Sequence, residues 1–350
     1  MKWRIPLLVV LLGLVLVPVA TVADLPGEGP VKELLGVDQG EPCGPIVNRG
    51  DPDLWRTEPR TPTLRDGPAG VVAGSHAYLV GGIADFTDGG TTADSLDTVE
   101  RFDFRTGRYQ QLPPLPQELN HVALAAWSGD VYAVGGLEDD LEEFTATNRA
   151  WRYRPAERRW EPIAPMPTAR GAAGAAVIGD RLYIVGGVAD GRRLRTLEML
   201  DLRTGGWSQL EPMDAERDHL GVAVLDGKLY ALGGRRGDER PLVDFERYDP
   251  ATDSWERLPT IPEATSGFGF EEYGGRLIAA GGEDLRRRVL TGSVWAYSPE
   301  SESWSRMPAM SRPKHGFAMV EYDGRLWAFS GSRCSGFFPV RSVDSWRPPA

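Results

Sequence analysis

The chain has 350 residues, of which 41% are hydrophobic and 25% are charged, and its formal net charge is −11. This is a globular composition, long enough for a large core, with 42 Gly and 28 Pro that indicate many turns. The acidic balance argues against a general binder of nucleic acid or of anionic membranes.

Residues 1–23 have the pattern of a secretory signal. A short basic start, Met1 to Arg4, precedes the uncharged run Ile5–Ala23, which is rich in Leu and Val. We expect cleavage after Ala23 and a secreted or periplasmic protein. The alternative is an uncleaved N-terminal anchor, because about 18–20 apolar residues can just span a bilayer. Membrane contact is expected only in that case.

Residues 24–44 are predicted to be a linker, and residues 45–350 to form one folded domain. The chain has two cysteines, Cys43 and Cys334. In an exported protein an even number of cysteines favours a disulfide, so we expect these two to pair. Two free thiols are the alternative.

A Gly-Gly doublet preceded by an apolar run recurs along the folded part. First-position spacings are 54, 51, 47, 48 and 49 residues, which is a repeat period near 50. The doublets are Gly81-Gly82, Gly135-Gly136, Gly186-Gly187, Gly233-Gly234 and Gly281-Gly282, followed by the degenerate Ser330-Gly331.

Aromatic residues keep a fixed distance to the doublets. In each repeat, one aromatic residue lies 26 residues before the first position of the doublet. These residues are Trp55, Tyr109, Trp160, Trp207, Trp255 and Trp304. A second anchor lies seven residues before the aromatic in five repeats, at Phe102, Tyr153, Leu200, Tyr248 and Tyr297. The copy Tyr248-Asp249-Pro250 is the clearest.

This combination of diglycine, Tyr-Asp-Pro-like turn and spaced Trp resembles the kelch-repeat family, from about Trp55 to Trp346. The departures are Leu200, Ser330 and Tyr109. The resemblance implies an all-β, six-bladed kelch-type β-propeller with four strands per blade. In the third repeat we expect strands over Gly171–Ile178, Arg181–Val185, Arg195–Leu200 and Trp207–Leu210.

The two ends of the chain predict how the ring closes. Trp55 has no third strand before it, and the chain ends after Trp346 with no room for a fourth strand. We therefore expect an N-terminal strand near Trp55 to complete the last blade. Cys43 and Cys334 both fall near this seam.

Length variation between repeats falls between the doublet and the next aromatic. It is largest in the first two repeats, which contain residues 85–90 and the acidic run 138–143. We expect these loops to share one face and to carry binding. The acidic run lacks the spacing of a known calcium loop, so we interpret it as a solvated loop.

Basic residues and histidines precede each predicted inner strand on that same face. We predict that they ring the mouth of the central channel and contact a ligand, with hydrogen bonding to loop carbonyls as the alternative role. They are Arg65, His121, Arg170, Arg217, His219, Lys314 and His315, with Arg312 beside them.

Catalytic and metal-binding motifs are missing from the sequence. It has four His, no His-x-x-x-His, no Cys-x-x-Cys and no Gly-x-Ser-x-Gly. We therefore predict a monomeric scaffold that recognises a protein or glycan, with no nucleic acid, cofactor or metal.

An enzyme is the alternative. Kelch propellers include sialic acid mutarotases exported to the periplasm, and Arg170, Glu216 and Arg217 are candidates for such chemistry by position. A copper radical oxidase and an intracellular adaptor fit less well.

Overall fold

The computed structural model describes residues 43–51, 54–84, 94–140 and 143–349, and every regular element in this part of the chain is a β-strand. The predicted signal, most of the predicted linker and the insert 85–90 lie outside the described residues. None of the described residues forms a helix long and apolar enough to cross a membrane.

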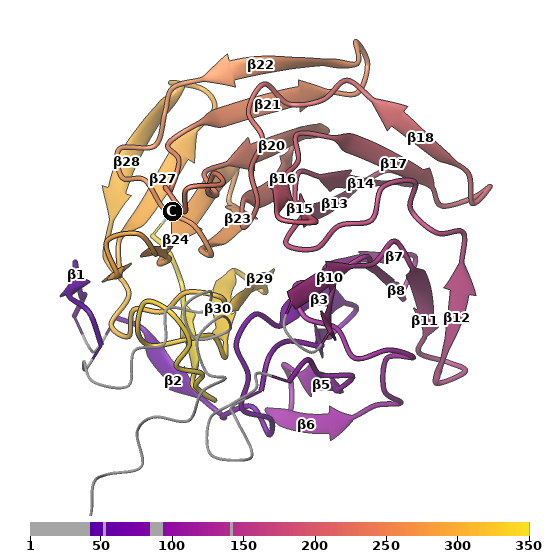
Figure 1. Cartoon of the computed structure of the whole chain (residues 1–350). Coiled ribbons are helices and arrows are strands. Elements are labelled where there is room, and N and C mark those ends of the chain that lie inside the picture. The colour runs from indigo at the N-terminus through magenta and orange to yellow at the C-terminus, as the bar shows by residue number, and fades with distance from the viewer. Residues whose placement is uncertain (1–42, 52–53, 85–93, 141–142, 350) are drawn as a thin grey trace, which may run out of the picture.

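Six four-stranded antiparallel sheets make up most of the structure, and Figure 1 shows them arranged around a common centre. Sheet 1 contains β3 (Ala69–Ala73), β4 (His76–Val80), β5 (Val99–Asp103) and β6 (Arg108–Gln111). Sheet 2 contains β7 (Ala123–Trp127), β8 (Asp130–Val134), β11 (Ala150–Arg154) and β12 (Arg159–Ile163). Sheet 3 contains β13 (Gly174–Ile178), β14 (Arg181–Val185), β17 (Leu197–Asp201) and β18 (Trp207–Leu210).

The other three sheets repeat the same order. Sheet 4 contains β19 (Gly221–Leu225), β20 (Lys228–Leu232), β21 (Phe245–Asp249) and β22 (Ser254–Leu258). Sheet 5 contains β23 (Gly269–Tyr273), β24 (Arg276–Ala280), β27 (Val294–Ser298) and β28 (Ser303–Met307). Sheet 6 contains β29 (Ala318–Tyr322), β30 (Arg325–Phe329), β31 (Val343–Trp346) and β2 (Arg56–Glu58).

Sheet 6 combines the two ends of the chain. Its outer strand β2 pairs antiparallel with β31, with Arg56 opposite Ser345 and Glu58 opposite Val343. The rings of Trp55 and Trp346 stack with their centroids 5.4 Å apart, and both side chains are buried. The N-terminal segment is also held by β1 (Ile46–Val47), which pairs in parallel with β26 (Val289–Thr291).

Short hairpins extend the connections between second and third strands. They are β9 (Leu137–Asp140) with β10 (Glu143–Ala146), β15 (Val188–Ala189) with β16 (Arg192–Arg193), and β25 (Glu283–Asp284) with β26. The expectation that the acidic run 138–143 is a loop is corrected for its described residues, because residues 138–140 in β9 pair with residues 143–145 in β10.

The anchor aromatics hold neighbouring strands and sheets together. Tyr248 on β21 packs against Trp255 on β22 with ring centroids 5.2 Å apart, and Trp255 Nε1 donates to the carbonyl of Glu211, in the connection that follows sheet 3. Trp160, Trp207 and Trp304 donate in the same way to Pro113, Ala164 and Pro259. The fixed spacing therefore keeps a ring pair in five of the six sheets; in sheet 3 Leu200 replaces one ring opposite Trp207. Tyr109 makes the equivalent hydrogen bond to Pro59, whereas the buried Nε1 of Trp55 has no partner in the described residues.

The doublet glycines lie where the backbone passes close to the next repeat. At Gly135, φ is +62°, and a Cβ atom would lie 2.3 Å from the carbonyl oxygen of Arg170. Only glycine meets both constraints without strain.

Apolar clusters fill the spaces between neighbouring sheets. One cluster lies between each successive pair from sheet 1 to sheet 6, and another joins sheet 6 to sheet 1 through residues such as Phe329 and Phe102. This all-β architecture of four-stranded antiparallel sheets is consistent with a kelch-type β-propeller, as the sequence predicted.

Candidate functional site

One face of the molecule carries the connections from second to third strands, including all three hairpins. The entry segments of the innermost strands lie on the same face, because each pairs with the residue just after a doublet, as Asp218 does with Arg235. Figure 1 shows the molecule viewed along the axis around which the sheets are arranged. We call this the loop face.

Six equivalent residues in these entry segments connect neighbouring sheets through backbone contacts. Each lies 14 residues before the first doublet position and has a positive φ of 50–60°, at Gly67, His121, Ala172, His219, Gly267 and Gly316. Backbone N–H groups donate to the equivalent carbonyl of the neighbouring repeat at 2.7–3.1 Å in five cases, including Gly67 to Gly316. The two histidines are thereby fixed beside the space between the innermost strands of the six sheets, which we call the channel.

Four of the predicted ligand-binding residues have buried side chains that pair with an acidic side chain. Exposure is 0–1% for the cations and 1–3% for their partners. The pairs are Arg65 with Glu100, Arg170 with Glu198, Arg217 with Glu246, and Lys314 with Asp344. Side chains without exposed surface cannot contact a solute, so the structure gives these four a role in holding the sheet together.

The Arg170 pair illustrates this role. Arg170 Nη2 lies 2.7 Å from Glu198 Oε2, and Thr168 Oγ1 donates to Glu198 Oε1 at 2.6 Å. Burial lowers the pKa of Arg170 to about 10, although the Glu198 carboxylate acts in the opposite direction. The guanidinium thus stays charged at neutral pH.

Sequence reasoning overlooked the acidic partners, although a signal was present. Each is the second residue of the third strand in its sheet. In the two repeats without a cation, Leu119 and Thr265 take its place, and the second residues of the third strands are Trp151 and Trp295. In this chain, a repeat that lacks the cation therefore also lacks the acid at the second position of its third strand.

His121 and His219 line a cavity of about 240 Å³ at the loop-face end of the channel. Their rings meet edge to face with centroids 4.7 Å apart. His219 Nδ1 donates to Asp218 Oδ1 at 3.0 Å, and Arg235 Nη2 lies 3.3 Å from His219 Nε2. Burial, followed by the charge of the neighbouring basic groups, lowers the pKa of both histidines, so both are neutral at pH 7. Of the predicted ligand-binding residues, these two line the cavity.

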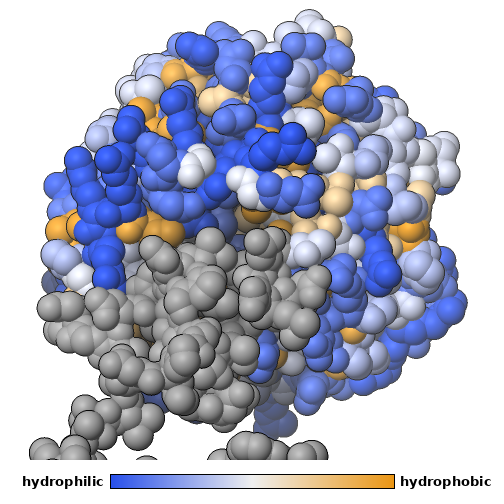
Figure 2. Space-filling model, in the orientation of Figure 1, coloured by the Kyte–Doolittle hydropathy of each residue, from blue (hydrophilic) through white to orange (hydrophobic). Residues whose placement is uncertain are grey.

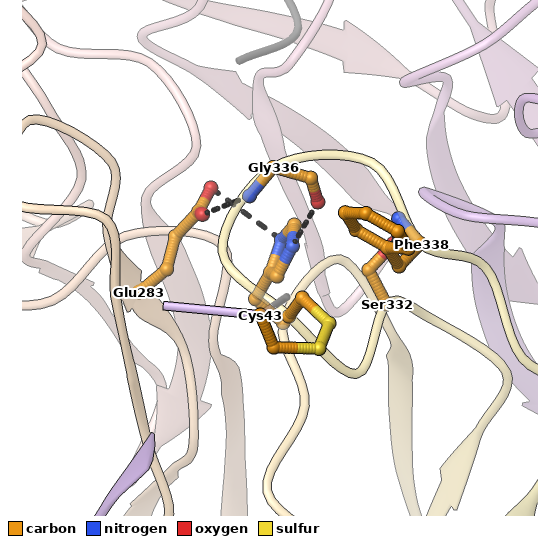
Figure 3. Close-up of a disulfide and its surroundings, with 7 residues drawn as sticks. Cys43, Glu283, Ser332, Gly336 and Phe338 are labelled. Atoms are coloured by element: carbon orange, nitrogen blue, oxygen red, sulfur yellow. Dashed lines mark hydrogen bonds and ion pairs between the residues drawn. A yellow bond between two sulfur atoms is a disulfide. The ribbon is translucent and has the colours of Figure 1, made fainter. Parts of the chain in front are cut away.

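His315 is instead a buried structural residue beside the disulfide. Cys43 and Cys334 are bonded as predicted. Figure 3 shows this disulfide beside the segment that carries Ser332, Gly336 and Phe338, with the Glu283 carboxylate directed toward Gly336.

The His315 ring connects this segment to the hairpin β25–β26. His315 Nδ1 lies 3.4 Å from Glu283 Oε1, and His315 Nε2 lies 2.7 Å from the carbonyl oxygen of Gly336. Burial opposes the charged form, but Glu283 and Asp66 outweigh it and raise the pKa of His315. Burial also raises the pKa of the nearby Asp66 carboxyl to about 6.

Replacing His315 by glutamine is expected to destabilise the fold more at low pH than at high pH. Because the folded-state pKa of His315 is raised, its charged contact with Glu283 stabilises the fold fully below the unfolded pKa of about 6.5 and loses this effect as pH rises through the folded pKa. Near pH 5 the loss should be about 1.5–3 kcal/mol, the usual contribution of a hydrogen bond to a charged group. Urea unfolding of both proteins at about pH 5 and about pH 9 measures it, and an equal difference at both pH values would contradict it.

The end of the channel away from the loop face is lined by acidic residues instead of histidines. A cavity of about 380 Å³ is lined by small apolar residues and by Glu271, Glu272 and Glu321. Burial and the two neighbouring carboxylates raise the pKa of Glu271 to about 8. Within the described residues, no group of three or more His, Cys, Asp or Glu side chains is arranged to hold a metal ion.

The residues named for the enzyme alternative do not form a common site. The Arg170 and Arg217 side chains are fully buried in separate sheets, whereas Glu216 is exposed. Arg312, named with the basic residues that precede the inner strands, is half exposed and pairs with Asp344 at 2.6 Å.

A pocket that sequence reasoning missed lies on the loop face between sheets 4 and 5. Its volume is about 500 Å³, and three of its six lining residues are the exposed arginines Arg240, Arg286 and Arg287. The runs Arg235-Arg236 and Arg286-Arg287-Arg288 were visible in the sequence, but only the fold brings them into neighbouring loops.

Comparison with known proteins agrees with the repeat pattern. Residues 121–331 match the KLHDC2/KLHL20/DRC7 Kelch-repeats domain, and residues 64–116 match the Kelch motif.

Among curated relatives, Kelch-like protein terF of Aspergillus terreus is 33% identical over 147 residues, which is 39% of this chain and 31% of the relative. Kelch-like protein 40 of Xenopus laevis is 35% identical over 107 residues, covering 29% and 16%. Human Kelch domain-containing protein 8B is 28% identical over 156 residues, covering 43% of each chain. The matched segments span less than half the length of these relatives.

The family match covers more than half of the chain and coincides with the doublets, the paired aromatics and the four-stranded sheets. The chain therefore belongs to the kelch-repeat family, whose members generally serve as protein-binding scaffolds.

Proposed function

We propose that this chain is an exported binding scaffold in which six blades form one closed ring and the loop face recognises a protein partner. The closed ring is supported by the contacts of sheet 6 with sheet 1, by the hydrogen bond from Gly67 N to Gly316 O, and by the pairing of β2 with β31. A glycan is the alternative ligand.

Export is supported by two features. Residues 1–23 have the composition of a secretory signal, and the Cys43–Cys334 disulfide is of the kind that persists in oxidising compartments. We propose cleavage after Ala23, a linker over residues 24–44 and a monomeric mature protein.

The proposal that the loop face binds the partner rests on the difference between the connections on the two faces. All three added hairpins and the arginine pocket lie on the loop face. The opposite face is built from short turns between first and second strands, such as Gly179-Asp180. Extra loops gathered on one side of a rigid scaffold are the usual location of binding.

A steric block of each face tests this proposal. Both native cysteines are bonded, so a single new cysteine can be coupled to a long polyethylene glycol chain. Arg192→Cys places the polymer on the loop face, and Arg203→Cys places it on the opposite face, where the side chain is 72% exposed. Residues 24–350 serve as bait for proteins and glycans of the native extracellular fraction.

We expect partners enriched by the uncoupled bait to be lost with the Arg192→Cys conjugate and kept with the Arg203→Cys conjugate. Equal retention by both conjugates would refute recognition through the loop face. Enrichment of glycans alone would replace the protein partner by the alternative.

A further inference from the structure

The arginine pocket is built by loops from two neighbouring sheets. Arg240 and Pro241 come from the connection between β20 and β21, and Ala264 comes from the connection that enters β23. Asp284, Arg286 and Arg287 come from the hairpin β25–β26. Pro241 and Ala264 give the pocket of about 500 Å³ a small apolar part between charged walls.

The guanidinium groups of this pocket keep hydrogen-bond donors available. Arg240 and Arg286 lie 3.4 Å and 3.7 Å from Asp238, and Arg287 lies 3.7 Å from Asp284. These separations exceed the usual 2.7–3.2 Å of an N–H···O hydrogen bond. The three side chains are 56–82% exposed, so their donors face solvent.

The local charge is opposite to that of the whole protein. Three arginines meet two carboxylates here, whereas the chain carries a net charge of −11. In the same loop the exposed Arg236 adds a cation, and Glu239 is already paired with Arg193 and Arg235. The closed pairs at Arg65, Arg170 and Arg217 differ, because there each cation is buried against its own acid. Figure 2 shows strongly hydrophilic residues on the left of this view, over sheet 5, and at the top, over sheet 4.

The backbone holds these arginines in place before any ligand arrives. Arg287 N donates to Asp284 Oδ1 at 3.0 Å, and Arg236 N donates to the carbonyl of Arg240 at 3.1 Å. The strand that leaves the hairpin, β26, is clamped between β25 and β1. Binding a ligand here therefore requires ordering of side chains only, which keeps the entropic cost low.

We infer that this pocket recognises clustered Asp and Glu side chains of the protein partner. A guanidinium donates two parallel hydrogen bonds to a carboxylate, and three convergent guanidiniums suit two or three adjacent acids. A long polyanion such as nucleic acid or a sulfated glycan is disfavoured, because its charges would extend beyond the pocket onto the acidic remainder of the surface. The inference rests on the proposed function and names the chemistry of its partner.

The test uses residues 24–350 and a fluorescent hexaglutamate peptide, with hexaserine and a heparin hexasaccharide as comparison probes. The pocket variant is Arg286→Glu/Arg287→Glu. The matched control is Arg105→Glu/Arg203→Glu, which makes the same charge change at two side chains, each 72% exposed, in turns on the opposite face. Fluorescence anisotropy at low and at physiological salt gives the dissociation constants.

We expect hexaglutamate to bind the wild-type protein, to weaken with salt, and to lose at least tenfold in affinity in the pocket variant, about 1.4 kcal/mol. The control variant should stay within about twofold. Equal weakening in both variants, or no binding of hexaglutamate at low salt, overturns the inference. If heparin binds in a way that depends on the pocket and hexaglutamate does not bind, an acidic peptide is not the ligand of the pocket.

This failure is distinguishable from failure of the proposed function. If partners captured by the bait are blocked by the Arg192→Cys conjugate but still bind the Arg286→Glu/Arg287→Glu variant, the loop face recognises them without this pocket. The scaffold proposal then survives, and the pocket inference is wrong.

Discussion

Replacing Arg170 by leucine is expected to lower the free energy of unfolding by about 3–5 kcal/mol, because it leaves the Glu198 carboxylate buried without a cation. Glu198 would keep only its contacts with Thr168. Chemical denaturation monitored by Trp fluorescence measures the loss.

Two further variants separate a buried pair from a surface pair. Arg257 pairs with Asp214, but the two side chains are 78% and 50% exposed, so Arg257→Leu should change stability by less than about 1 kcal/mol. The double variant Arg170→Leu/Glu198→Trp copies the Leu119 and Trp151 combination of the second repeat and should regain most of the loss. A similar loss in Arg170→Leu and Arg257→Leu would show that burial of the pair is not what matters.

The double replacement Cys43→Ser/Cys334→Ser is expected to cost about 2–5 kcal/mol of stability. The disulfide joins residues 291 positions apart, so it removes much of the conformational freedom of the unfolded chain. It also holds the segment that carries Gly336 against Glu283 and His315. Urea denaturation with and without reductant measures the effect.

The reductant supplies the control for this prediction. Reduced wild-type protein should have the stability of the double serine variant, and that variant should not respond to reductant. If reduction leaves wild-type stability unchanged, the pairing of β2 with β31 and of β1 with β26 is sufficient to hold the N-terminal segment.

The repeat architecture was predictable because its requirements recur in every repeat. Gly135 must allow close approach to Arg170, and Trp255 must reach both Tyr248 and the carbonyl of Glu211. Such constraints fix residue types at fixed spacings, so the sequence shows them. The expected strands of the third repeat agree with β13, β14, β17 and β18 within about three residues. The inner strand begins at Gly174 instead of Gly171, since Ala172 has a positive φ.

The candidate site was harder to predict, because its features occur once or depend on distant partners. Arg65, Arg170, Arg217 and Lys314 were assigned to a ligand from their place in the chain, whereas their acidic partners lie 28–35 residues further on. Within the described residues, hairpins β9–β10, β15–β16 and β25–β26 extend sheets 2, 3 and 5 but sheet 4 has none, so the repeat period does not predict them. The arginine pocket needs two loops that are separated in sequence and brought together only by the packing of sheets 4 and 5.

The composite sheet 6 also has a consequence for biosynthesis. Trp55 and β2 leave the ribosome among the first residues of the folded part, but their partners β31 and Trp346 are made only after sheets 1 to 5. A nascent chain therefore carries an unsatisfied strand and an exposed indole while sheets 1 to 5 are being completed. During that interval the strand edge is open to pairing with other chains, so a translational pause or a truncation before residue 343 should favour aggregation over a shorter soluble product.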